Sequence, residues 1–252
     1  MKLEIYSTKG EKNEAHKMLT DMVENELLNV AYADVIRWRV RGYLKDKCID
    51  NYYVAYTDEK CLSRLWTGWG KHKDAVGNFG HFKTLEELRG QGIGKKILEM
   101  WKEDIFGRDD LPLALFCSAK PRIAAVYANY GFVKAIPSQN EEENFLYNPL
   151  KNAPATFDEF CKDYYKPSDT LIHKRADIEY RHEIDCLLKF ALVSLGEEFN
   201  MGEYELIEEY IVRCPERVGM LFTEDGHCVG WSLDDKIKVH PIYKDAQITD
   251  ER

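Results

Sequence analysis

One stretch of the chain, His81 to Lys96, has the residue types and spacing to hold a phosphate group. It reads HFKTLEELRGQGIGKK, so an apolar strand-like pattern leads into three glycines and then into a helical pattern. Gly90, Gly92 and Gly94 allow the backbone to come close to a ligand. The free N–H groups at the start of the helix, around Ile93 to Lys96, would point at an anion. The alternative is an ordinary tight turn between a strand and a helix, which a glycine pattern alone does not exclude.

A second stretch, Val126 to Phe132, reads VYANYGF and adds to the first. Arg89 to Gly94, RGQGIG, fits the pattern R/Q-x-x-G-x-G/A, and the second stretch is similar to L-Y-x-x-x-G-F. These two motifs, in this order, resemble those of the GNAT acyltransferase superfamily, and the resemblance covers about residues 1–150. The glycine spacing differs from the Rossmann fingerprint, and the Gly-Lys-Ser/Thr of a P-loop is absent.

The resemblance implies that acetyl-CoA is the cofactor. It implies that main-chain N–H groups of one segment hold the pyrophosphate: Arg89, Gly90, Gln91, Gly92, Ile93, Gly94 and Lys95. Phe82, Lys83 and Thr84 would pair with the pantetheine amides as a neighbouring strand would. Thr84 stands where the family usually has Val, which pairing through the backbone tolerates. Arg122 or Lys120 would contact the adenosine phosphate end, although the family often has Asn at the position of Lys120.

The resemblance also places Tyr127 on the tyrosine that commonly protonates the departing thiolate. A tyrosine with an ordinary pKa of about 10 suits a thiolate of similar basicity. Taken alone, the same tyrosine would be an apolar-face helix residue four positions after Ile123. For the base that neutralises the amine, we consider His81 first, then Glu86 and Asp74. A solvated side chain, or a water relay that needs none of them, is the competing interpretation.

Hydrophobic periodicity predicts the elements that carry these residues. In the first 150 residues, strands are expected at Leu3–Tyr6, Asn51–Tyr56, Leu62–Trp69, Val76–Leu85, Leu113–Cys117, Val133–Ile136 and Asn144–Tyr147. Helices are expected at Ala15–Leu27, Tyr32–Leu44, Ile93–Ile105 and Pro121–Tyr130, the last ended by Gly131.

The second of these helices has a basic stripe. Ile36, Val40, Tyr43 and Leu44 are expected to face inward, and Arg37, Arg41 and Lys45 are then expected to line the opposite face at four-residue spacing. Such a stripe is usually a solvated face. The alternative is a contact surface for an anionic group of the acceptor.

The last 100 residues predict a shorter set of elements. These are a strand at Leu171–Lys174, helices at Ile184–Leu195 and Met201–Arg213, and a hairpin of Val218–Thr223 with Cys228–Leu233. Asn200 followed by Glu203 resembles a capping box. Both halves therefore give a strand, two helices and a hairpin, and Tyr56–Leu62 looks like Phe222–Val229 with one insertion. This is either a faint internal repeat or chance.

Composition limits the possible partners. The chain has 252 residues, 44% apolar residues and a formal net charge of -9. The acidic balance argues against a nucleic-acid partner, and the lack of a long apolar run or signal sequence argues against a membrane, so we expect a cytoplasmic protein. The seven cysteines are scattered without metal-ligand spacing, so we expect reduced thiols and no metal site. Covalent catalysis by Cys117 would need an activating histidine, and none is evident nearby.

The sequence thus predicts an α/β fold: a mixed, mostly antiparallel sheet flanked by helices, as in GNAT proteins. We expect a cofactor-binding catalytic domain at residues 1–152 and a smaller α/β domain at 157–252 that resembles an incomplete second half. The second domain would narrow the acceptor cleft or form the interface of a homodimer. The expected function is acetyl transfer from acetyl-CoA to a primary amine of a small molecule or peptide. The alternative is a catalytically inactive module that binds or senses acyl-CoA.

Overall fold

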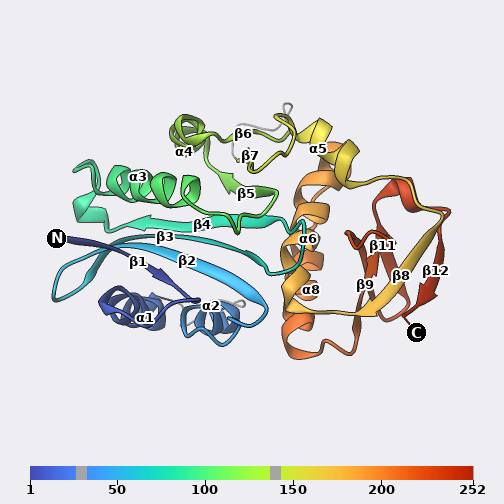
Figure 1. Cartoon of the computed structure of the whole chain (residues 1–252), viewed down its shortest axis with the longest axis horizontal. Coiled ribbons are helices and arrows are strands. Elements are labelled where there is room, and N and C mark those ends of the chain that lie inside the picture. Colours follow the sequence, from blue (N-terminus) through green and yellow to red (C-terminus); the bar gives the residue numbers. More distant parts are fainter. Residues whose placement is uncertain (27–32, 137–142, 252) are drawn as a thin grey trace. The chain divides into compact units, whose positions relative to one another are not determined.

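The computed structural model describes residues 1–26, 33–136 and 143–251 (Figure 1). By packing, the chain forms two compact units. The first comprises Met1–Lys71 and Asn78–Leu111, and the second comprises His72–Gly77 and Pro112–Arg252. The boundary predicted between residues 152 and 157 lies within the second unit, so the two-domain division stays a prediction.

The first unit contains a four-stranded arrangement covered by helices. Its elements are β1 (Lys2–Ser7), α1 (Glu14–Glu26), α2 (Ala33–Val40), β2 (Cys48–Tyr56), β3 (Cys61–Gly70), β4 (Gly77–Thr84), the 3-10 turn η1 (Glu86–Leu88) and α3 (Ile93–Phe106). The strands lie in the order β1-β2-β3-β4, and β2 pairs antiparallel with both β1 and β3. Figure 1 shows α1 and α2 on one side of these strands and α3 on the other. Every strand predicted for this unit is confirmed.

Apolar spacing explains both helix layers of the first unit. In α1, Ala15, Leu19 and Val23 recur at four-residue spacing and pack in one core cluster with Tyr52 of β2. On the other side, α3 buries Ile93, Ile97, Leu98, Trp101 and Ile105, the face that its spacing predicts. Its Trp101 ring lies edge-to-face against Phe79 of β4, with ring centroids 5.0 Å apart.

The second helix is shorter than predicted. It ends at Val40, and Gly42 adopts a φ of 74°, a left-handed conformation that ends helices. Tyr43 is therefore not an inward-facing residue, because it is 67% exposed. The basic residues also do not form one helical face: Arg37 and Arg41 both bind Glu24, whereas Lys45 follows the turn. Leu27 and Tyr32, which the predictions include, lie outside the described residues.

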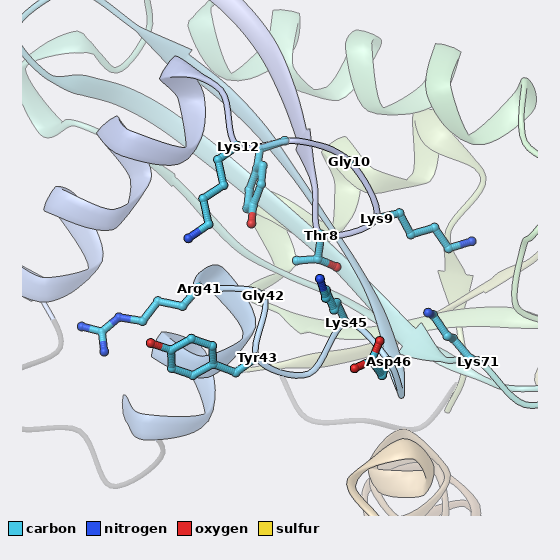
Figure 2. Close-up of a pocket in the computed structure, with 11 residues that line it drawn as sticks. Thr8, Lys9, Gly10, Lys12, Arg41, Gly42, Tyr43, Lys45, Asp46 and Lys71 are labelled. Carbon is cyan, nitrogen blue, oxygen red and sulfur yellow. The ribbon is translucent and has the colours of Figure 1, made fainter.

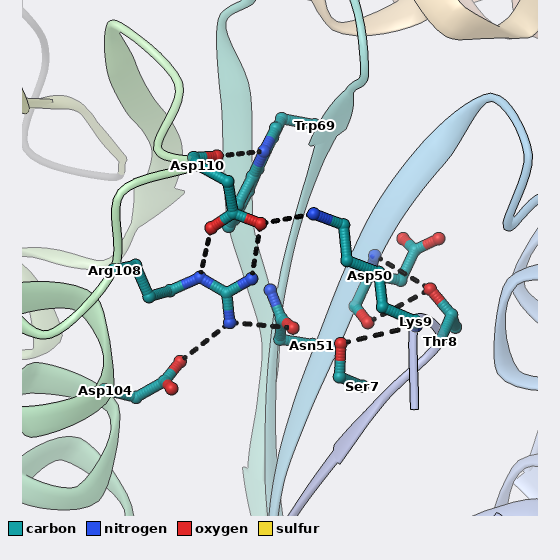
Figure 3. Close-up of polar contacts among 9 residues, drawn as sticks. All are labelled: Ser7, Thr8, Lys9, Asp50, Asn51, Trp69, Asp104, Arg108 and Asp110. Carbon is teal, nitrogen blue, oxygen red and sulfur yellow. Dashed lines mark hydrogen bonds and ion pairs between the residues drawn. The ribbon is translucent and has the colours of Figure 1, made fainter. Parts of the chain in front are cut away.

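Polar contacts fix the end of the sheet where β1 ends and β2 begins (Figure 3). Asp50 of β2 is buried, and its backbone groups bond both the N–H and the hydroxyl of Thr8. After α3, Arg108 binds Asp110 through two nitrogens, and Lys9 lies 2.5 Å from the same carboxylate. Arg108 also donates to the side chain of Asn51 at 3.3 Å, so the segments after β1 and after α3 meet β2 here.

The second unit begins with β5 (Ala114–Ala119), α4 (Pro121–Tyr127), the 3-10 turn η2 (Ala128–Tyr130), β6 (Val133–Lys134), β7 (Asn144–Pro149) and α5 (Phe157–Tyr164). Strand β7 pairs antiparallel with both β5 and β6. Aromatic side chains pack across the predicted boundary, since Phe116 of β5 lies 5.8 Å from both Phe157 and Phe160 between ring centroids. The sequence did not anticipate α5, which Thr156 caps by accepting a hydrogen bond from the N–H of Glu159.

The rest of the second unit has a five-stranded sheet in the order β11-β10-β9-β8-β12. Its elements are β8 (Thr170–Arg175), η3 (Ile178–Tyr180), α6 (Arg181–Asp185), the π-helical η4 (Cys186–Ala191), α7 (Leu192–Ser194), α8 (Met201–Arg213), β9 (Val218–Phe222), β10 (Cys228–Leu233), β11 (Lys236–Val239), η5 (Pro241–Tyr243) and β12 (Gln247–Asp250). Asn200 caps α8 as predicted, although Glu203 binds Lys238 instead of completing the capping box. Strand β12 pairs parallel with β8, and all four of its residues are exposed.

The likeness between the two halves extends to their geometry. In β8 to β11, consecutive strands pair antiparallel in chain order, as β1, β2 and β3 do. Thr57 and Thr223 each begin a turn by donating a backbone N–H to the turn's last carbonyl, at 2.9 and 3.0 Å. Cys61 and Cys228 each direct the thiol to the carbonyl two residues ahead, at 3.6 and 3.7 Å. The α/β fold with antiparallel strands flanked by helices is thus confirmed.

Two further findings concern the chain as a whole. Each of its seven cysteines is a free thiol. No helix in the described ranges is both long and apolar enough to span a bilayer.

Candidate functional site

The glycine-rich segment is a strand, a turn and a helix, as its sequence predicts. Strand β4 ends at Thr84, η1 follows as a single 3-10 turn, and α3 begins at Ile93. Gly90 and Gly92 have φ values of 80° and 78°, a left-handed conformation that glycine adopts without strain. A Cβ at either position would meet nothing within 4 Å, so the backbone there is open to a ligand.

The start of α3 leaves main-chain donors available. Its N-cap is Gly92, which has no side chain with which to cap the helix. The first N–H groups of any α-helix lack a partner within the helix, and here α3 gains its first i to i-4 bond when Lys96 donates to the carbonyl of Gly92. The 14 residues of α3 add a dipole whose positive end lies at these donors. Such a helix start can hold an anionic group.

Gly94 brings the helix start against the end of β4. A Cβ on Gly94 would lie 3.0 Å from Cζ of Phe82 and 3.4 Å from Oγ1 of Thr84. The hydroxyl of Thr84 is itself held by Ser63 of β3 at 2.9 Å. The structure therefore brings together two of the predicted contacts, Phe82–Thr84 and Arg89–Lys95.

The residues of this segment fit a pyrophosphate. The open faces of Gly90 and Gly92 give room, the start of α3 gives N–H donors, and Arg89, Lys95 and Lys96 give exposed positive charge. Arg89 shares its charge with Glu86, whose carboxylate lies 3.6 Å away.

His81 lies within β4 in an unusual conformation. Its φ is 53°, and a non-glycine residue with a left-handed backbone inside a strand is typical of a β-bulge. The residue is exposed, and its ring lies edge-to-face against Trp66, with centroids 5.3 Å apart. Strained backbone of this kind is concentrated at functional sites. Among the predicted bases, His81 thus has the most distinctive position.

The other two predicted bases lie elsewhere. Glu86 is in η1, beyond the end of β4, and its side chain is 87% exposed. Asp74 lies in the loop between β3 and β4, in the second unit, with its carboxylate 3.5 Å from Lys73. Glu86 and Asp74 thus lie on other segments than β4, which carries His81.

Tyr127 is in the second unit, at the end of α4. Its ring is buried against Phe132, with centroids 5.6 Å apart. The buried face of α4 passes through Ala124 and Tyr127, whereas Ile123 is 40% exposed. The alternative of an apolar-face residue thus fits the burial of Tyr127, but Ile123 does not share that face. Burial, with a smaller contribution from Cys117, raises the pKa of Tyr127 above its ordinary value. The sequence-based expectation that Tyr127 has an ordinary pKa therefore needs correction. Its hydroxyl holds the proton more tightly than that of an ordinary tyrosine.

The remaining predicted residues of the second unit surround the start of α4. Arg122 is exposed on the first turn, and Lys120 is the residue before Pro121. Cys117 of β5 is buried, and burial raises the pKa of its thiol. A thiol that resists ionisation is a poor nucleophile, which disfavours the covalent route.

His72 and Glu183 form a buried pair in the second unit that the sequence does not predict. His72 Nε2 lies 3.1 Å from Oε1 of Glu183, whose side chain is completely buried. The N–H of Val76 donates to the same oxygen at 2.9 Å, and Tyr180 stacks on the His72 ring. No sequence spacing links residues so far apart, so only the fold could reveal this pair.

Comparisons with known proteins identify the family of the chain. A family model described as "Acetyltransferase (GNAT) domain" matches residues 18–151, which is more than half of the chain. Among solved structures, the chain is similar to an acyl-CoA N-acyltransferase from Pseudomonas aeruginosa, with 16% identity over 58% of this chain and 99% of that one and a TM-score of 0.41. It is also similar to Escherichia coli ElaA, with 11% identity over 59% of this chain and 99% of ElaA and a TM-score of 0.42. A chain of the NatC complex bound to Gag peptide and CoA shows 17% identity over 60% and 100%, with a TM-score of 0.40. No curated protein sequence matches the chain.

Proposed function

Because the chain belongs to the GNAT acetyltransferase family, we propose that it transfers an acetyl group from acetyl-CoA to a primary amine by direct attack. Family membership supports an acyl-CoA-dependent acyltransferase in general. The observation that carries the proposal is the start of α3, where uncapped N–H groups follow the open turn at Gly90 and Gly92. A diphosphate gains there from hydrogen bonds and from the helix dipole together.

In this proposal, the segment from Arg89 to Lys95 holds the pyrophosphate through main-chain N–H groups. Those of Gly90 and of residues 92–95 are the donors, since the N–H groups of Arg89 and Gln91 already donate to the carbonyls of Glu86 and Leu88. The backbone of Phe82–Thr84 pairs with the pantetheine amides, and Arg122, with Lys120 as the other candidate, contacts the adenosine phosphate. Bound acetyl-CoA supplies an activated thioester. The close fit of Gly94 against Phe82 supports this placement, because it fixes the helix start relative to the end of the strand.

We assign proton transfer to two side chains. Tyr127 donates its proton to the departing thiolate. Its hydroxyl is protonated at neutral pH, although burial raises its pKa and so makes it a weaker acid than an ordinary tyrosine. His81, exposed on β4, is the first candidate to accept the proton of the amine, directly or through water, and Glu86 is the second. The acceptor is a primary amine of a small molecule or peptide.

The proposal is tested by incubating the whole protein with acetyl-CoA and a panel of small-molecule and peptide amines, with thiol release as the readout. We expect at least one amine to raise thiol release well above the rate of acetyl-CoA hydrolysis. CoA binding is measured in parallel by calorimetry. Tight binding without amine-stimulated thiol release would instead support an inactive acyl-CoA-binding module, and absence of binding would exclude both functions.

A further inference from the structure

A basic pocket lies in the first unit, away from the glycine-rich turn (Figure 2). Its volume is about 890 Å³, within the range of small-molecule sites. Three stretches of chain line it: the end of β1 and the residues after it, the turn after α2, and Lys71 after β3. Figure 2 shows five cationic side chains around it: Lys9, Lys12, Arg41, Lys45 and Lys71.

The charge of the pocket contrasts with that of the chain. Five cationic side chains face a single acidic one, Asp46, in a protein whose net charge is -9. Lys9 and Arg41 are partly neutralised by Asp110 and Glu24. Among the described residues, Lys12, Lys45 and Lys71 have no acidic partner within ion-pair distance. Three cations that line one pocket without counter-ions create a local positive potential that attracts anions.

The floor of the pocket is firmly built. Tyr6 and Thr8 are buried, and the hydroxyl of Tyr6 donates to the carbonyl of Val40 at 3.1 Å. Thr8 is bonded to Asp50 through both backbone and side chain. The left-handed Gly42 turns the chain back over this floor. The backbone that carries part of the pocket is therefore held in place by these bonds, while the lysine side chains themselves are exposed.

This pocket is distinct from the candidate pyrophosphate site. It lies where β1 ends, β2 begins and β3 ends, as the pairing of Cys48 with Gly70 shows. The glycine-rich turn lies at the other end, because the N–H of Leu85 donates to the carbonyl of Leu62, near the start of β3. At about 3.3 Å per residue, the 10 residues of β3 separate the two places by roughly 30 Å.

From these observations we propose that the pocket is a second anion site, which binds a small molecule carrying two or more phosphate or carboxylate groups. Several cations spread around one concave surface favour a multivalent anion over a single charge. The concave shape favours a compact ligand over an extended polyanion. The site is independent of acetyl transfer and would exist even in a protein without turnover.

The proposal is tested by calorimetric titration of the full chain with inorganic triphosphate and, separately, with citrate. If only triphosphate binds, the ligand carries phosphate groups. If only citrate binds, the ligand carries carboxylate groups. If both bind, the site selects its ligand by negative charge alone. The variants Lys12→Gln and Lys45→Gln should each weaken binding by roughly tenfold, since each removes a charge-assisted contact. Lys17→Gln, which removes an exposed charge outside the pocket, should bind as the wild type does.

Triphosphate can also occupy the proposed pyrophosphate site, so Gly92→Ala separates the two sites. This variant should lose only the binding at the glycine-rich turn and keep the triphosphate and citrate binding that Lys12→Gln and Lys45→Gln weaken. The proposal is overturned if neither probe binds, if both lysine variants bind normally, or if Gly92→Ala abolishes the binding.

His16 provides a readout that is independent of the calorimetry. Its ring lies 4.6 Å from that of Tyr6 between centroids, and burial, followed by the charge of Lys12, lowers its pKa. A polyanion bound at Lys12 should raise the pKa of His16 in NMR titrations of the wild type and of Lys17→Gln. An unchanged pKa with saturating probe would place the anion elsewhere and refute the pocket as its site.

Discussion

The ring of Phe82 occupies the space that a side chain at position 94 would need. A Cβ on Gly94 would lie 3.0 Å from Cζ of this ring, closer than most contacts of this kind. Because β4 and α3 meet there, the first turn of the helix is held against the strand that is proposed to pair with the cofactor. Any bulk at Gly94 must therefore displace either the ring or the helix start.

Gly94→Val is expected to lower the affinity for CoA at least tenfold and to destabilise the fold by about 1–3 kcal/mol, as overpacking usually does. Gly107→Val is the control, because a Cβ at Gly107, at the other end of α3, has contacts of 3.5 Å or longer. Calorimetry with CoA and urea unfolding measure the two effects. Equal CoA affinity in both variants would contradict the role assigned to the helix start.

Gly92→Ala is expected to force a side chain into a left-handed backbone, which costs roughly 1–2 kcal/mol of unfolding free energy. Gly226→Ala is a matched control, since Gly226 has a φ of 92° and equally open surroundings. Both variants should lose similar stability in urea unfolding, but only Gly92→Ala should weaken CoA binding. If Gly226→Ala weakens it as much, the effect reflects general destabilisation.

Tyr127→Phe is expected to lower turnover roughly 10- to 1000-fold with little change in CoA affinity, because it removes the proposed proton donor and keeps the ring. Tyr147→Phe serves as the control: it removes a buried hydroxyl of the same unit, which donates to the carbonyl of Pro154 at 2.7 Å. That variant should lose about 1 kcal/mol of stability and keep its turnover. Thiol release is the assay, and full activity of Tyr127→Phe would refute the acid assignment.

The pair of His72 and Glu183 should make stability depend on pH. Burial alone would lower the pKa of His72. The hydrogen bond and charge of Glu183, with smaller contributions from the Lys73 carbonyl and Glu179, together raise it. A histidine whose pKa is higher in the folded state stabilises the fold. This stabilisation is complete when the pH is below the pKa in the unfolded state, about 6.5, and it is lost as the pH rises through the pKa in the folded state.

His72→Gln keeps an N–H donor but has no titratable charge. We therefore expect the wild type to have the higher free energy of unfolding, as measured by urea denaturation. The difference between wild type and variant should be larger at pH 5.5 than at pH 8.5. A difference that is the same at both pH values would show that the pair does not titrate with folding.

Removing residues 157–252 is expected to make the rest of the chain insoluble. Phe116 and Tyr147, which lie before the predicted boundary, pack against Phe160 and other aromatic residues that follow it. Exposed aromatic surface of this kind promotes aggregation. The soluble fraction after expression of residues 1–156 measures this, and a soluble fragment with a cooperative thermal transition would prove the expectation wrong.

Local patterns predicted most of the strands and the glycine-rich turn. Strand positions follow from runs such as Asn51–Tyr56, whose aromatic and β-branched residues favour extended backbone, and the turn follows from glycines with an intrinsic freedom of φ. The helix α2 was overextended because its apolar spacing continues past Gly42, and the glycine, not the periodicity, decides where it ends. Helix α5 was missed although Thr156 and the spacing of Phe157, Phe160 and Tyr164 do mark it.

Features that depend on pairing of distant residues could not be predicted. The basic pocket joins Lys12, Lys45 and Lys71, which come together only because β1, β2 and β3 pair in register. The raised pKa of Tyr127 depends on burial, which its motif does not contain. Likewise, the left-handed backbone of His81 belongs to the strand in its sheet and not to the residue type.

Strand β12 has a consequence for how the protein tolerates changes at its C-terminal end. It contributes no buried side chain, and backbone pairing with β8 joins it to the sheet. Without it, the N–H and C=O groups along one side of β8 would be left as an open edge, which can recruit strands from other molecules. Shortening the chain before Gln247 would therefore move the open edge of the sheet from β12, whose side chains are all exposed, to β8, which carries the buried Leu171.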